Sequence, residues 1–100
     1  MIKAGIIGGS GYTGGELIRI LLNHPKVEID FVYSTTRAEK ELSSAHPDLL
    51  GQTEMKFTGE VNSNVDVVFL CLGHGNSSKF LKENTFSDNS KIIDLSNDFR

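Results

Sequence analysis

A cluster of glycines near the N-terminus constrains the fold of this chain more than any other feature of its sequence. Gly8-Gly9-Ser10-Gly11-Tyr12-Thr13-Gly14-Gly15 follows the apolar run 2–7 and precedes an amphipathic segment. The cluster has the spacing GxGxxG from Gly9. Glycine permits a tight turn, Gly11 lets a ligand approach the backbone, and Gly14 lets a helix pack closely on a strand. A strand, a glycine turn and a helix are therefore expected in this order.

The segments on either side of the glycines have the periodicities of a strand and a helix. Residues 2–7 form a β-branched, apolar run of the kind found in buried parallel strands. From residue 12 to about residue 23 the apolar positions lie on one stripe of a helix, which His24-Pro25 ends. These positions are Leu17, Ile18, Leu21 and Leu22. A second strand is predicted where apolar residues then alternate, at Val27, Ile29, Phe31 and Tyr33.

The rest of the chain continues the alternation. Residues 65–72 and 91–95 are β-prone runs, and Asn76 or Ser77 is a candidate cap for a helix that reaches about residue 84. Between the second predicted strand and residue 65, 38–42 is a candidate helical turn, 46–51 has the composition of a loop, and 55–58 is a candidate short strand. The expected fold is α/β: a Rossmann-type, doubly wound parallel sheet. No helix follows the last strand to cover it, so a larger protein cut at Arg100 is expected, rather than a sheet completed by a partner.

Composition excludes several classes of protein. The 100 residues are 38% hydrophobic and 23% charged, which fits a soluble folded domain. The net charge is −3 and the ten Lys and Arg are scattered, so no nucleic-acid partner is expected. The first apolar run is too short for a membrane span or a signal peptide. One cysteine allows no intrachain disulfide, no Cys or His spacing predicts a metal site, and a reducing cytoplasm fits best.

The glycine cluster predicts a phosphate site. The first N–H groups of a helix have no partner within it, and the helix dipole favours anions at that end. The hydroxyls of Ser10 and Thr13 add two donors. Placed between a strand and a helix, the motif indicates binding of a dinucleotide through its pyrophosphate; the alternative is a tight turn with a structural role only.

The end of the second predicted strand indicates which dinucleotide is bound. Sites for NAD usually carry an acidic residue there, which holds the ribose 2′-hydroxyl. This chain has Ser34-Thr35-Thr36-Arg37 instead. Hydroxyls and a guanidinium suit a 2′-phosphate, since Arg donates two parallel hydrogen bonds to it. NADP is therefore favoured; the alternative is that Arg37 is an ordinary solvated loop residue.

A third candidate follows the run 65–72. Gly73-His74-Gly75 would lie at the carboxyl edge of the sheet, where His74 either contacts the nicotinamide end or a substrate, or has no role beyond the loop. Cys71 is interpreted as a buried structural thiol because nothing beside it in the sequence would stabilise a thiolate. His24 and His46, each followed by proline, are interpreted as loop residues.

Taken together, four motifs resemble those of the N-acetyl-γ-glutamyl-phosphate reductases of arginine biosynthesis. The most specific are the Ser-Gly-Tyr-Thr-Gly run and the closing Asp-Leu-Ser-Asn-Asp-Phe-Arg. In sequence order the motifs are Gly8 to Leu17, His46-Pro47-Asp48-Leu49, Val68 to Gly75 and Ile93 to Arg100. One position departs from the family pattern, which usually has proline where this chain has Gly73.

The resemblance implies that residues 1–100 are an incomplete NADP-binding domain, followed in the whole enzyme by an α+β domain for catalysis and dimerisation. The family reduces an N-acyl-glutamyl phosphate with NADPH to the semialdehyde and phosphate, through a cysteine thioester. It implies a homo-oligomer and a small-molecule substrate, and the sequence features above already predict no membrane or nucleic-acid partner. The cofactor positions it carries over are Gly8, Ser10, Gly11, Tyr12, Thr13, Gly14, Ser34, Arg37, Gly73, His74 and Gly75.

No catalytic residue is carried over to this chain. The family nucleophile lies in an Asn-Pro-Gly-Cys motif, which these 100 residues lack, so it and the assisting histidine are expected beyond Arg100. The chain alone is therefore predicted to be inactive. Two alternatives stay open: a non-catalytic NADP-binding module, and a relative of the aspartate-semialdehyde dehydrogenases, whose glycine loop usually ends in valine-glycine.

Overall fold

Four parallel strands form the centre of the computed structural model of this chain, which describes residues 2–8, 12–34, 37–49, 51, 53–72, 80, 86 and 89–95. The strands are β1 (Ile2–Ile7), β2 (Val27–Tyr33), β3 (Val67–Leu70) and β4 (Lys91–Asp94), in the order β2-β1-β3-β4. The helix α1 (Tyr12–Leu22) connects β1 to β2, and two short 3-10 helices follow, η1 (Leu42–Ser44) and η2 (Pro47–Leu49).

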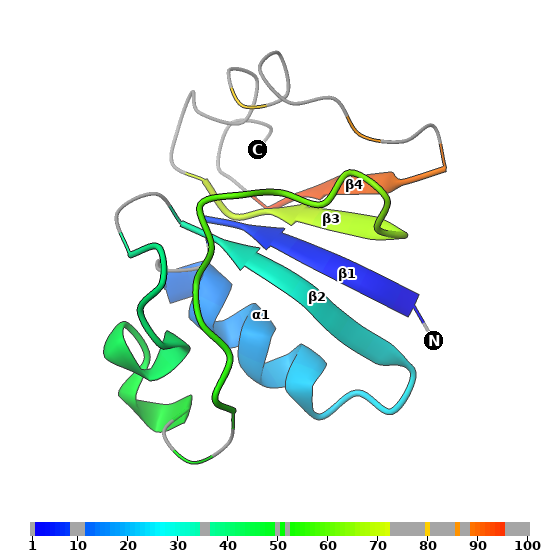
Figure 1. The fold of residues 1–100 in the computed structure, drawn as a ribbon. Helices are drawn as coiled ribbons and strands as arrows, with labels where there is room; N and C mark the ends of the chain where they lie inside the picture. The colour runs from blue at the N-terminus through cyan, green and yellow to red at the C-terminus, as the bar shows by residue number, and fades with distance from the viewer. Residues whose placement is uncertain are drawn as a thin grey trace.

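The strand order makes β1 the point at which the chain reverses direction across the sheet. β2 lies on one side of β1, and β3 followed by β4 lies on the other. Because all the strands are parallel, their carboxyl ends meet at one edge, to which the four arrows point in Figure 1. The predicted α/β class with a Rossmann-type parallel sheet is confirmed.

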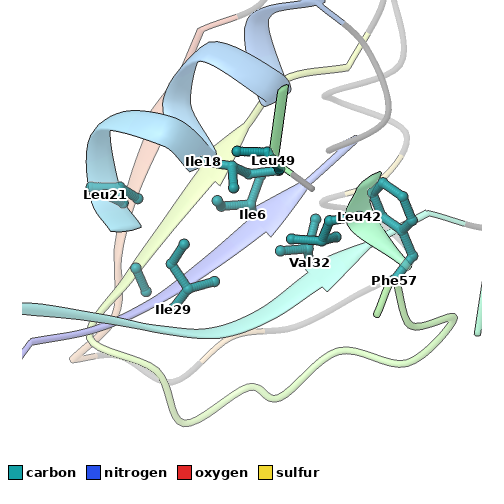
Figure 2. Close-up of a cluster of buried hydrophobic side chains, with 9 residues drawn as sticks. Ile6, Ile18, Leu21, Ile29, Val32, Leu42, Leu49 and Phe57 are labelled. Atoms are coloured by element: carbon teal, nitrogen blue, oxygen red, sulfur yellow. The ribbon is translucent and has the colours of Figure 1, made fainter. Parts of the chain in front are cut away.

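One face of the sheet is covered by α1. Its buried residues Ile18 and Leu21 belong to the predicted apolar stripe and contact the sheet, whereas Ile20 is 60% exposed. Figure 2 shows these side chains against residues from β1, β2 and the segment 42–57. The buried members of this cluster are Ala4, Ile6, Ile18, Leu21, Ile29, Val32, Leu42, Leu49 and Phe57. The N–H groups of Asn23 and His24 bond to carbonyls of the last turn, which ends the helix before Pro25 as predicted.

The other face of the sheet carries a second hydrophobic cluster, and a register shift between β1 and β2 places Phe31 in it. Between Ala4 and Gly5 the pairing jumps from Ile29 to Phe31. The alternation predicted to place these side chains on one face is therefore broken: Ile29 faces α1 and Phe31 faces away. A Cβ on Gly5 would lie 2.3 Å from the tip of the Phe31 ring, so glycine is required below it. The buried members are Ile7, Phe31, Val65, Val68, Leu70 and Phe80.

The connection from β2 to β3 runs along the free edge of β2 before it reaches the second half of the sheet. The N–H of Thr58 donates to Val32, and the N–H of Ser34 donates to Thr58. The predicted strand 55–58 is present only as isolated bridges, at Lys56 and Thr58. Residues 37–40 form turns, with φ of +69° at Glu39, and the loop predicted at 46–51 contains η2.

The last two strands are shorter than the β-prone runs that predicted them. β3 occupies four of the residues 65–72, and β4 ends at Asp94. Ile92 and Ile93 of β4 are 44% and 42% exposed. The helix predicted from residue 76 or 77 to about 84 lies, apart from Phe80, outside the described residues. Within the described part of the chain, no helix has the length and apolar character needed to cross a membrane.

Candidate phosphate-binding site at the carboxyl edge of the sheet

Gly8 makes the turn at the carboxyl end of β1. Its φ is +80°, in the left-handed region that favours glycine. A Cβ added here would lie 2.8 Å from the carbonyl oxygen of Cys71, the residue after β3. The N–H of Gly8 donates to Tyr33 at the end of β2. Gly8 therefore lies between the ends of three neighbouring strands, where α/β sheets bind their ligands.

The first turn of α1 starts four residues beyond Gly8. The helix begins at Tyr12, with Gly14 buried in its first turn and Thr13 exposed. None of the residues of this turn is acidic. The unpaired N–H groups and the positive end of the helix dipole at this terminus can therefore stabilise an anion without competition from a carboxylate in the same turn.

Ser34 and Arg37 follow the carboxyl end of β2, on the same edge of the sheet. Ser34 is buried, and its backbone N–H bonds to the carbonyl of Thr58. Arg37 is partly buried as a residue, and its guanidinium donates from Nη1 to the carbonyl oxygen of Ser44, 3.4 Å away, in an exposed hydrogen bond. A guanidinium has five N–H donors, so this bond orients the side chain and still leaves donors for a phosphate. The structure thus places Gly8, α1 and these two residues at one edge.

Cys71 lies at this edge but lacks the properties of a nucleophile. Burial raises the pKa of its thiol to about 11, and the negative charge of Asp94 adds to the shift. A nucleophilic or redox-active cysteine needs a thiolate at neutral pH, and Cys71 stays protonated there. Its half-buried side chain packs against the α1 side of the core. These observations agree with the interpretation of Cys71 as a structural thiol.

Five of the predicted cofactor positions lie outside the described residues. They are Ser10, Gly11, Gly73, His74 and Gly75. Of the remaining six, Tyr12 is described only by its backbone, as the first residue of α1.

His46 is the residue near this edge that sequence reasoning underestimated. It lies in a loop, as interpreted, but its side chain is only 9% exposed and its ring contacts Gly15 of α1. Two signals in the sequence could have indicated this contact. One is the motif His46-Pro47-Asp48-Leu49, and the other is that Gly15 is a second helical glycine which the GxGxxG spacing does not require.

Comparison with known proteins identifies the family. The profile of the family described as semialdehyde dehydrogenase, NAD binding domain, matches residues 3–100. The chain belongs to this family. The N-acetyl-γ-glutamyl-phosphate reductases of Flavobacterium johnsoniae and Christiangramia forsetii are 72% and 65% identical to it over 100 residues. That of Parabacteroides distasonis is 48% identical over 101 residues. The predicted resemblance is therefore confirmed over the whole chain.

These relatives are longer than the chain. The chain is covered completely in each of the three alignments but spans only 31% of each relative's length. Among solved structures, an aspartate semialdehyde dehydrogenase with NADP from Candida albicans superposes with a TM-score of 0.75 at 21% identity. That alignment covers 99% of this chain and 30% of the other. The semialdehyde dehydrogenase NAD-binding domain fold accounts for nearly all of these 100 residues.

Proposed function

We propose that this chain is the N-terminal NADP-binding part of an N-acetyl-γ-glutamyl-phosphate reductase. The observation that carries the proposal is the 72% identity to a protein of that name, which extends over every residue of the chain. The glycine turn at the point where the sheet reverses direction supports it independently. The complete protein would contain a second, catalytic and dimerising domain after these residues.

The described residues fit a bound dinucleotide phosphate. At Gly8 any side chain would fill the space between the turn and the carbonyl of Cys71, so the glycine keeps this backbone open to a close approach. The first turn of α1 and the Thr13 hydroxyl would hold the pyrophosphate, together with Ser10 and Gly11. Ser34 and Arg37 would hold the 2′-phosphate, and Gly73, His74 and Gly75 would lie near the nicotinamide.

In the complete enzyme NADPH supplies the hydride that reduces an acyl group to an aldehyde. The residues of this chain would bind and orient, since none of them is a candidate for the nucleophile and Cys71 stays a thiol at neutral pH. The reaction proposed for the whole protein is the reduction of N-acyl-glutamyl 5-phosphate to N-acyl-glutamate 5-semialdehyde and phosphate. That reaction belongs to arginine biosynthesis, in the cytoplasm, and a homo-oligomer is proposed.

The reading frame beyond codon 100 provides the first test. A continuation with an Asn-Pro-Gly-Cys motif is expected. A stop codon directly after Arg100 would contradict the reductase and favour a non-catalytic NADP-binding module. Activity of the complete gene product with N-acetyl-glutamyl phosphate, and none with aspartyl phosphate, distinguishes the reductase from an aspartate-semialdehyde dehydrogenase.

Arg37→Ala tests the choice of cofactor. Loss of a hydrogen-bonded charge pair costs about 1.5–3 kcal/mol, so NADP binding is expected to weaken about ten- to a hundredfold while NAD binding stays unchanged. Isothermal titration of both nucleotides against the complete gene product measures the difference. Lys40→Ala is the matched control, because it removes an exposed positive charge from the same turn. Equal binding of NADP and NAD by the unsubstituted protein would contradict the 2′-phosphate assignment.

A further inference from the structure

The contact between His46 and Gly15 joins two segments that are far apart in the sequence. A Cβ built on Gly15 would lie 2.5 Å from Nδ1 and 2.6 Å from Cε1 of the imidazole. Real side chains do not approach so closely, so the ring lies where a side chain of residue 15 would otherwise be. Glycine inside a helix lowers helix propensity relative to alanine. The chain therefore carries an unfavourable residue in α1 at the position where His46 packs.

His46 is held in place from several directions. The backbone N–H of His46 donates to the carbonyl of Leu42, 3.0 Å away. The backbone carbonyl of His46 accepts the N–H of Leu49 at 2.9 Å. Leu42 and Leu49 are fully buried in the cluster that also contains Ile18 of α1. The Phe57 ring lies 6.4 Å from the imidazole, centroid to centroid. Segment 42–49, which contains η1 and η2, is therefore fixed to the core by its buried leucines. The contact between His46 and Gly15 also connects this segment to the N-terminal part of α1.

The same segment also holds Arg37. The carbonyl that accepts the bond from the Arg37 guanidinium belongs to Ser44, two residues before His46. Segment 42–49 therefore contacts the helix end proposed for the pyrophosphate and the side chain proposed for the 2′-phosphate. Both groups belong to one ligand, so their binding sites must keep a fixed separation.

We propose that His46 is a positioning residue, which holds the N-terminal part of α1 at a fixed distance from the loop that carries Arg37. The inference rests on the proposed NADP site and adds a residue that does not touch the cofactor. A site held in the bound geometry avoids the entropic cost of ordering it when the ligand arrives. A dinucleotide that spans both subsites therefore binds more tightly when their separation is fixed, whereas the affinity of a ligand that occupies one subsite does not depend on that separation.

The test compares NADP, which spans both subsites, with 2′-AMP, which reaches only the Arg37 side, by calorimetric titration of the complete gene product. His46→Ala is expected to weaken NADP binding about tenfold and 2′-AMP binding less than about twofold. Val68→Ala is the control, because it truncates a buried side chain on the opposite face of the sheet. It is expected to lower the Tm with no change in the Kd of either ligand.

Gly15→Ala approaches the contact from the helix side and separates position from stability. Alanine raises helix propensity, yet its methyl group would push α1 away from the imidazole, so weaker NADP binding is expected in a helix that is not destabilised. In the double variant Gly15→Ala/His46→Ala the methyl group occupies space that the imidazole has left. NADP binding is then expected to return to within about threefold of the unsubstituted protein.

Three results would overturn the inference. One is that both single variants bind NADP as the unsubstituted protein does, and another is that His46→Ala weakens 2′-AMP as much as NADP. The third is an equal loss of NADP binding in His46→Ala and Val68→Ala, which indicates a stability effect only. Absence of NADP binding in the unsubstituted protein is a different outcome: it overturns the proposed function first, and the inference with it.

Discussion

The two halves of the sheet differ at β4: β3 has buried side chains, as β1 and β2 have, but the apolar side chains of β4 are exposed. In the β1–α1–β2 unit, Ile6, Ile7 and Val32 have no exposed surface, because side chains cover both faces of these strands. In β4 the corresponding apolar residues are exposed by 42% and 44%. The first half therefore gains far more from apolar burial, whereas β4 is held to β3 chiefly by the backbone ladder.

The difference indicates which part of the fold would keep the proposed phosphate site rigid. Gly8 and the first turn of α1 belong to the covered half, and segment 42–49 buries Leu42 and Leu49 in the same core. A phosphate site benefits from fixed N–H groups, since any reordering on binding reduces affinity. The carbonyl of Cys71, which follows β3, is the point at which the second half of the sheet meets this site.

Truncation of one isoleucine in each half should give the largest contrast. Ile6→Ala removes a side chain with no exposed surface and is expected to lower the free energy of unfolding by about 2–5 kcal/mol. Ile93→Ala removes a side chain that is 42% exposed, and the expected loss is below about 1 kcal/mol. Urea unfolding of the 100-residue chain, followed by far-UV circular dichroism, measures both. Similar losses of unfolding free energy for the two variants would mean that β4 is covered to the same extent as β1.

Alanine substitution of two glycines with positive φ, Gly8 and Gly51, should give a smaller difference in unfolding free energy. Gly8→Ala introduces a left-handed alanine and a contact with the Cys71 carbonyl, at a cost of at least about 2 kcal/mol in unfolding free energy. At Gly51, where φ is +85° and a Cβ would have no neighbour within 4 Å, only the backbone strain of about 1 kcal/mol is expected. The urea midpoints of both variants provide the measurement, and NADP titration should show weaker binding for Gly8→Ala alone. Equal losses of stability in Gly8→Ala and Gly51→Ala would show that the space between Gly8 and the Cys71 carbonyl can accommodate a methyl group.

The last prediction concerns the dependence of stability on pH. Since the pKa of Cys71 is raised from 9.0 to about 11 in the fold, the unfolded chain loses the thiol proton first as pH rises. The contribution to stability is complete below pH 9 and is lost between pH 9 and 11. Cys71→Ala should lack this loss, and other groups that titrate in the range are common to both proteins. Urea midpoints at intervals from pH 8 to 11 measure the difference; parallel curves would contradict the raised pKa.

Local pattern was enough for the regular elements of the covered half. The apolar run 2–7, the stripe of α1 and the proline after it each reflect interactions between residues near in sequence, and the observed bounds agree with them. The edge that carries Gly8, Ser34 and Arg37 was also predictable, because parallel strands bring their carboxyl ends together. The segment 34–58 was predicted poorly, since its bridges and 3-10 turns depend on pairing with the edge of β2.

The sequence by itself determined the order of strands and helix, the glycine turn and the family, because each depends on residue type at short and regular spacing. Only the tertiary structure decided that Phe31 turns away from α1 and lies over Gly5, and that His46 packs on Gly15. Both contacts join residues more than 25 positions apart in the sequence. They follow from how volumes fit when the sheet and helix close on each other, and no periodicity along the chain encodes that fit.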